Sequence, residues 1–125
     1  MNLNEEQKWS IARLAFWFLD RGRWSHAESL ARGLLTLDQR DGQAWLYYGE
    51  ARRQQDDIAE AARAFSEAAK LLEHRSDIWM RLGDSLIRLG RYDEARAALE
   101  NGLTCVDGDP GLRRRINALL EMCKS

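Results

Sequence analysis

A repeat with a period of 34 residues is the feature that most constrains how this chain folds. Aligning Trp45 with Trp79 also superposes Gly49 on Gly83, and one further period towards the N-terminus reaches Ile11. Three units follow one another without gaps, at residues 8–41, 42–75 and 76–109. Self-similarity at this length is typical of solenoids, in which each unit buries its apolar face against its neighbours. The sequence therefore predicts one repeat domain that spans residues 1–125.

Each unit is predicted to form two antiparallel helices. Valine and proline each occur once, and no stretch alternates β-branched residues with a period of two, so helix is favoured over strand. Large apolar residues one turn apart, such as Ile11 and Leu14, are expected to face the partner helix. Small residues recur where two helices must approach closely, namely Ala15, Gly49, Gly83, Ala27, Ala61 and Ala95.

The turns between the two helices of each unit carry a matching signal. Gly22 and Gly90 occupy the same repeat position, where the end of a helix favours a left-handed residue. Asp56 takes this position in the middle unit, and aspartate tolerates that conformation better than most residues do. All three units are therefore expected to turn in the same way.

Both ends of the chain carry helix-start signals. Asn4 and Gln7 form the pattern of a capping box. Asp109 followed by Pro110 predicts the start of a last helix over residues 110–123. Its residues at helical spacing form an apolar stripe of Leu112, Ile116, Leu119, Leu120 and Cys123. We expect this helix to cap the last repeat, because a solenoid otherwise exposes its terminal apolar face.

Charge and hydropathy exclude several classes of function. The formal net charge is −1 with acids and bases interspersed, so a nucleic-acid partner is not expected. No apolar run approaches the roughly 18 residues that cross a bilayer, and the first residues lack a secretory signal. Cys105 and Cys123 show no CxxC spacing and are interpreted as free thiols of a reducing compartment. These features predict a cytoplasmic protein that does not insert into membranes.

No motif indicates catalysis. His26 and His74 are isolated, and neither lies at metal-ligand spacing from a cysteine or another histidine. The glycine-rich, nucleophile and zinc-protease patterns that bind phosphates or assemble catalytic groups do not occur. We therefore expect neither an enzyme nor a bound cofactor or metal.

The repeat resembles the tetratricopeptide repeat over residues 8–109. The residues that carry the resemblance are clearest in the third unit: Trp79, Leu82, Gly83, Leu86, Ala95 and Leu99. Arg52 departs from the family pattern, because an apolar residue is usual there, and the proline usual near the end of each unit is absent. The resemblance implies an all-α fold, a right-handed superhelix of three helix-turn-helix repeats closed by the capping helix.

The resemblance also implies a concave groove lined by the first helix of each unit. The residues expected in it are Trp9, Ala12, Phe16, Leu19, Leu46, Tyr47, Glu50, Met80, Asp84 and Ile87. The lysine and asparagine with which some family members clamp a carboxylate are absent, and the N-terminal end of the groove is apolar and aromatic. Such a surface usually marks a protein contact. Trp17 and Trp24 are interpreted as packing residues instead.

The chain from Leu14 to Leu37 is similar to the small repeat chaperones of bacterial type III secretion, and most of all to the short export-apparatus chaperone. The shared features are an apolar helix ending at Gly22, an Ala27-Glu28 stretch, and the run from Leu34 to Asp38. This resemblance implies a small secreted subunit as the partner, brought by the chaperone to the export gate. The alternative is a scaffold or assembly adaptor that self-associates as a homodimer and is unrelated to secretion.

Overall fold

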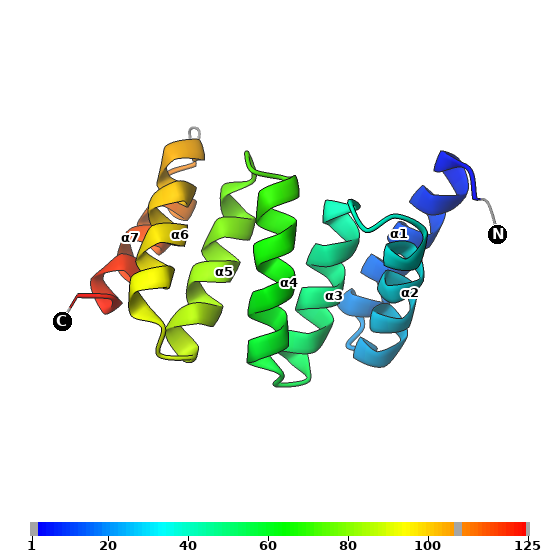
Figure 1. The fold of residues 1–125 in the computed structure, drawn as a ribbon, viewed down its shortest axis with the longest axis horizontal. Coiled ribbons are helices and arrows are strands. Elements are labelled where there is room, and N and C mark those ends of the chain that lie inside the picture. The colour runs from blue at the N-terminus through cyan, green and yellow to red at the C-terminus, as the bar shows by residue number, and fades with distance from the viewer. Residues whose placement is uncertain (1–2, 107–108, 125) are drawn as a thin grey trace.

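The computed structural model describes residues 3–106 and 109–124, and in these ranges the chain is a row of seven α-helices without strands (Figure 1). The helices are α1 (Glu5–Asp20), α2 (Trp24–Leu37), α3 (Gly42–Gln54), α4 (Ile58–Leu71), α5 (Ser76–Arg88), α6 (Tyr92–Cys105) and α7 (Pro110–Met122). Each helix packs mainly on its neighbours in the sequence. The all-α repeat architecture with a closing helix is therefore confirmed. Residues 107 and 108, which belong to the third predicted unit, lie outside the described ranges.

Small residues allow the two helices of each repeat to approach closely. A Cβ atom added to Gly49 would lie 2.7 Å from Phe65 Cε1, and one added to Gly83 would lie 2.5 Å from Leu99 Cδ2. The corresponding residue of the first repeat, Ala15, is fully buried. Any larger side chain at these positions would force the helices apart, typically at a cost of ~1–3 kcal/mol.

The three turns adopt the left-handed conformation that the sequence predicts. The φ angles are 73° at Gly22, 66° at Asp56 and 76° at Gly90. Asp56 is the only residue other than glycine with a positive φ in the described ranges. The middle repeat therefore turns as the others do, with a residue that tolerates the conformation less well.

Both predicted helix starts are confirmed. The backbone N–H of Gln7 donates to Asn4 Oδ1 at 2.7 Å, and the backbone N–H of Asn4 donates to Gln7 Oε1 at 3.0 Å. At the other end, Asp109 accepts from the backbone N–H of Leu112 at 3.0 Å, and Pro110 occupies the first turn of α7.

A recurring hydrogen bond joins each of the last two repeats to the loop before it. The indole N–H of Trp45 donates to the Gln39 carbonyl at 2.9 Å, and that of Trp79 donates to the Glu73 carbonyl at 2.9 Å. Gln39 and Glu73 occupy the position where the family usually has proline. No preceding repeat exists for α1 within the described ranges, and Ile11 replaces the tryptophan there.

Arg52, the residue that departs from the repeat pattern, joins the first repeat to the second. Its guanidinium donates to Glu28 of α2 at 3.0 Å and also pairs with Asp57, the N-cap of α4. Glu28 additionally accepts from Gln55 at 3.0 Å. Pairing with Asp57 and then Glu28 raises the pKa of Arg52. The charged side chain thus replaces an apolar contact with an ionic one between repeats.

The exposure of side chains on the first helix, α1, differs from the prediction. Leu14 and Trp17 were predicted to pack between helices, yet each is 45% exposed. That prediction is wrong for α1, because no helix among the described residues covers this face. Trp24 is half-buried.

Within the described ranges, none of the helices combines the length and apolar character needed to cross a membrane.

Candidate functional site

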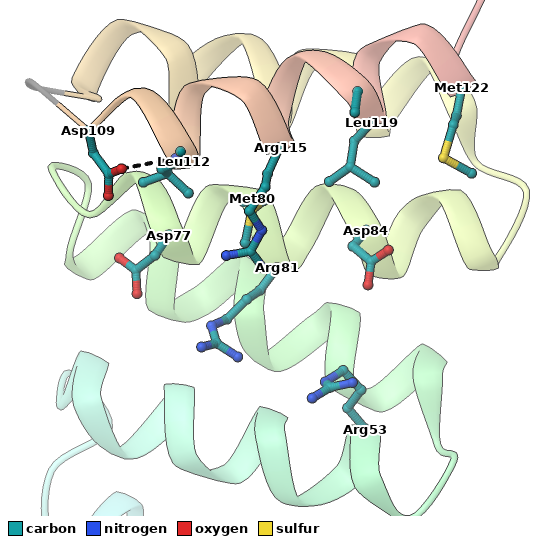
Figure 2. A pocket seen from close by; sticks show the side chains of 12 residues that line it. Arg53, Asp77, Met80, Arg81, Asp84, Asp109, Leu112, Arg115, Leu119 and Met122 are labelled. Atoms are coloured by element: carbon teal, nitrogen blue, oxygen red, sulfur yellow. Dashed lines mark hydrogen bonds between the residues drawn. The ribbon is translucent and has the colours of Figure 1, made fainter.

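A hollow of about 690 Å³ lies between α5 and α7, with the end of α3 at its edge (Figure 2). Met80 of α5 and Leu112, Leu119 and Met122 of α7 supply its apolar part. Figure 2 shows three arginines entering it from three helices, Arg53, Arg81 and Arg115. The hollow is therefore amphipathic and offers apolar contact beside hydrogen-bond donors.

The contribution of α7 to this hollow is absent from the sequence prediction, which treated the helix only as a cap. One further step of the 34-residue period places α7 where the first helix of a fourth repeat would lie. In that register Gly111, Ala118 and Met122 occupy groove positions, and all three line the hollow. Extending the period past residue 109 is thus the signal that would have found them.

Charges at the centre of the groove are neutralised within the chain. Glu50, a predicted groove residue, accepts from Arg53 at 3.0 and 3.2 Å and pairs with Arg81 of the next repeat. The hydrogen bond to Glu50 raises the pKa of Arg53. Because Glu50 is engaged twice, it is not available as a single negative charge for a partner's cation.

The acidic residues of α5 are paired in the same way. Asp84 lies 3.3 Å from Arg88, and Asp77 accepts two hydrogen bonds from Arg75 at 2.9 and 2.8 Å. Burial acts to raise the pKa of Asp77, but the bonds from Arg75 and the positive charges of Arg75 and Arg81 together hold this pKa below its ordinary value. The groove therefore presents ion pairs instead of a field of one sign.

A second hollow of about 470 Å³ lies between α1 and α3, at the N-terminal end of the expected groove. It contains Phe16 and Tyr47, whose ring centroids are 6.2 Å apart. The other residues that line it are Arg13, Trp17, Asp20 and Arg21. Phe16 is 57% exposed. Trp9 is 60% exposed but lies in a neighbouring shallow depression with Leu14 and Trp17.

The structure does not bring all predicted groove residues to the surface. Leu46, Met80 and Ile87 are buried in the main core, although Met80 still lines the larger hollow. Ala12 and Leu19 are half-buried on α1. The exposed apolar groove surface therefore lies at its two ends, on α1 and on α7.

The geometry suits a bound polypeptide. In the described ranges no three His, Cys, Asp or Glu side chains come together in a way that could hold a metal ion. His26 and His74 are both exposed, and His26 packs on Phe18 with ring centroids 5.0 Å apart. Apolar side chains beside guanidinium donors can hold both the side chains and the carbonyl groups of a peptide.

Comparison with known proteins identifies the family of this chain. A family model for the tetratricopeptide repeat matches residues 52–114, and a second such model matches residues 18–74. The chain belongs to the tetratricopeptide repeat family. A comparison with curated proteins gives no match to this sequence.

Solved structures with the same fold include chaperones of type III secretion. The translocator chaperone SycD of Yersinia enterocolitica has a TM-score of 0.89 at 20% identity, with 98% of this chain and 86% of that chain covered. PcrH of Pseudomonas aeruginosa, in complex with the chaperone binding region of PopD, has a TM-score of 0.88 at 22% identity, with coverages of 98% and 94%. SycD has also been solved with a peptide of the translocator YopD, with a TM-score of 0.88, 20% identity and coverages of 98% and 96%. At these identities the likeness establishes the fold.

Proposed function

We propose that this chain is a cytoplasmic, non-enzymatic chaperone of a bacterial type III secretion system. It holds an apolar or helical segment of a small secreted protein in the groove formed by α1, α3, α5 and α7. The main supporting observation is that the exposed apolar groove surface lies beside the ion pairs of Glu50 with Arg53 and Arg81, and of Asp84 with Arg88. Such a surface favours a hydrophobic segment over a charged chain terminus.

The structural neighbours support the same assignment. SycD and PcrH have been solved with segments of the translocators YopD and PopD, and both chains superpose on nearly all of this one. Their partners are translocators, so a translocator-type subunit is the client class that we favour. The export gate is a further expected contact, because a chaperone must deliver its client there.

The test is co-purification of the tagged chain from its native bacterium, followed by mass spectrometry. We expect one dominant secreted protein that carries an apolar segment, encoded near the gene for this chain. Phe16→Glu and Met122→Glu place a charge at either end of the groove and should each reduce capture at least about tenfold, since burying an unpaired charge is costly. Both residues are more than half exposed, so their replacement should leave the helical circular dichroism unchanged.

Leu37→Glu is the matched control, because Leu37 is an exposed apolar residue at the end of α2 and lines none of the hollows described above. It should retain full capture. Leu46→Glu is less informative, because Leu46 is buried and its replacement would disturb the core. Undiminished capture by both groove variants would refute the groove as the binding site. A captured partner that stays inside the cell would favour the scaffold alternative.

A further inference from the structure

The hollow between α5 and α7 contains one arginine that no described residue neutralises. Arg115 is exposed on α7 and lines this hollow. Within the described ranges it forms no ion pair, whereas Arg53 and Arg81, the two other arginines of the hollow, both pair with Glu50. Figure 2 shows the Arg115 side chain extending from α7 towards Met80 of α5. Its guanidinium is therefore free to bind an anion that enters the hollow.

The pairs around Glu50 also leave an excess of positive charge. Arg53 and Arg81 share this single carboxylate, so two positive charges meet one negative charge. Arg81 bonds to Glu50 through Nη1, and its Nε is buried without a hydrogen-bond partner in the part of the chain that the structure describes. Arg115 adds a further positive charge to the same hollow. Because like charges repel, an anion placed between Arg81 and Arg115 would be stabilised by both.

The acidic residues that line the hollow do not supply this anion. Asp77 and Asp84 form the ion pairs with Arg75 and Arg88 described above. Asp109 is the N-cap of α7, where its side chain accepts from the backbone. The missing negative charge therefore has to come from a bound partner.

Apolar side chains lie on both sides of Arg115. Leu112 precedes it by three positions and Leu119 follows it by four, so these residues share one face of α7, and all of them line the hollow. A bound segment whose anion meets Arg115 thus contacts apolar side chains in both directions along α7. A chain terminus would contact only one of them. The surroundings favour an aspartate or glutamate inside a segment, with an apolar residue on each side.

The position of Arg115 distinguishes it from the other unpaired arginines of the same helix. Arg113 and Arg114 also form no ion pair with a described residue, but they line none of the hollows described above. Only Arg115 among these three faces a hollow with apolar walls and a second arginine. An ordinary solvated arginine has neither.

We propose that the hollow between α5 and α7 binds an acidic side chain of the client segment, and that Arg115 is the residue that determines this specificity. The inference rests on the proposed function, because it takes a client segment to lie in the groove. It adds the chemistry of that segment, namely an aspartate or glutamate between two apolar residues. A charge-assisted hydrogen bond is roughly twice as strong as a neutral one, so this residue selects among segments that are equally apolar.

The first test uses short random peptides displayed on phage and the purified chain. Peptides selected by the unmodified chain should be enriched in an acidic residue flanked by apolar ones, and Arg115→Glu should select lysine or arginine there instead. Arg114→Glu makes the same charge change on the neighbouring residue, outside the hollow, and should select acidic peptides. A synthetic copy of the best peptide, amidated at its C-terminus, should bind Arg115→Glu at least about tenfold more weakly than Arg114→Glu, because a charge-assisted bond is lost.

The second test uses the client identified by the co-purification above. Arg115→Glu should reduce capture of this client about tenfold, and replacing the acidic residue of the client segment by lysine should restore it. Arg114→Glu should capture the unmodified client fully. Both arginines are exposed, so neither replacement should change the helical circular dichroism.

Several results would overturn the inference. Selected peptides without an acidic residue, a selection without any binder, or an affinity that Arg115→Glu leaves unchanged would each do so. Binding that requires a free C-terminal carboxylate would also overturn it, because the hollow would then hold a chain terminus. A client captured equally by Arg115→Glu and Arg114→Glu would refute this site and leave the proposed function standing. Acidic peptides selected by a chain that captures no secreted protein would do the reverse.

Discussion

The two ends of this solenoid are completed in different ways. At the C-terminal end α7 packs on α5 and α6, fully buries Ile116, and turns Arg113, Arg114 and Asn117 outward. At the N-terminal end the capping box satisfies backbone groups of α1, but Leu14 and Trp17 of that helix stay exposed. The comparison shows that satisfying the backbone at a helix end and covering its apolar face are separate requirements of a solenoid. Only the C-terminal end meets both within one chain.

The ends also differ in how they connect to the core. The main hydrophobic cluster contains residues of α3 to α7 and none of α1 or α2. Ala15 is the one buried residue of α1. The first repeat is attached to the second by a small cluster around Tyr48 and by the ionic contact of Glu28 with Arg52. We therefore expect the N-terminal repeat to be the less stable part of the molecule.

The largest effect should come from removing the apolar anchor of the C-terminal cap. Ile116→Ala deletes a fully buried side chain in contact with Gly102. The free energy of unfolding should fall by about 2–5 kcal/mol, as is usual for a buried isoleucine. Urea denaturation followed by circular dichroism measures it.

Leu14→Ala is the matched truncation at the open end and should change the stability of the monomer by less than about 0.5 kcal/mol. Equal losses of unfolding free energy for Ile116→Ala and Leu14→Ala would contradict the contrast between a covered C-terminal end and an uncovered N-terminal end.

A smaller effect is expected at the ionic contact between the first and second repeats. Glu28→Gln removes the charge that Arg52 meets across the α2–α3 boundary, and the Glu28 side chain is only 16% exposed. The free energy of unfolding should fall by about 1–3 kcal/mol, which is the usual result when a largely buried group loses its partner. Glu121→Gln, in an exposed pair with Lys124, is the control and should change little.

The same contact makes stability depend on pH. Burial acts to raise the pKa of Glu28, but hydrogen bonds from Arg52 and Gln55, together with the positive charges of Arg52 and Arg32, hold this pKa below its ordinary value of 4.5. A carboxyl with a lower pKa in the folded chain stabilises the fold above its unfolded pKa, and this contribution disappears as the pH falls through the folded value. The gap in stability between the unmodified chain and Glu28→Gln should therefore be full near pH 7 and close below pH 4.5. A gap that widens on acidification would contradict this assignment.

Periodicity was sufficient to predict most of the fold. A strict 34-residue period places small residues opposite Phe65 and Leu99, and it places Asp56 at a left-handed turn, because both features are local to one repeat. It could not predict the exposure of Trp17. The pattern assigns that position to a helix interface, and Trp17 is exposed because no helix among the described residues packs on this side of α1.

The groove was less predictable than the fold, because its character depends on contacts between repeats. The pairing of Glu50 with Arg81 joins side chains 31 positions apart, so the sequence indicates a free carboxylate where the structure has a neutralised one. The depth at which Leu46 and Ile87 lie likewise follows from packing against neighbouring helices, which the spacing does not reveal.

A further, smaller effect would test the comparison by stabilising the N-terminal repeat, the end that we expect to be less stable. Gly33 lies within α2, and a Cβ atom added there would have no neighbour within 4 Å. Gly33→Ala should therefore stabilise α2 by about 0.5–1 kcal/mol, because alanine loses less backbone freedom in a helix. Amide hydrogen exchange should slow in α1 and α2 but not in α6 and α7, if the N-terminal repeat opens as its own unit.

Gly90→Ala is the matched control for that substitution. A Cβ atom at Gly90 also has no neighbour within 4 Å, but the residue has a φ of +76°, so the same change should destabilise the chain. Because neither added Cβ atom meets a neighbour, opposite changes in stability for Gly33→Ala and Gly90→Ala would come from backbone conformation and not from packing. If Gly33→Ala slowed exchange equally in all seven helices, the chain would be opening as a single cooperative unit. The two ends would then differ in what they expose and not in how firmly they are held.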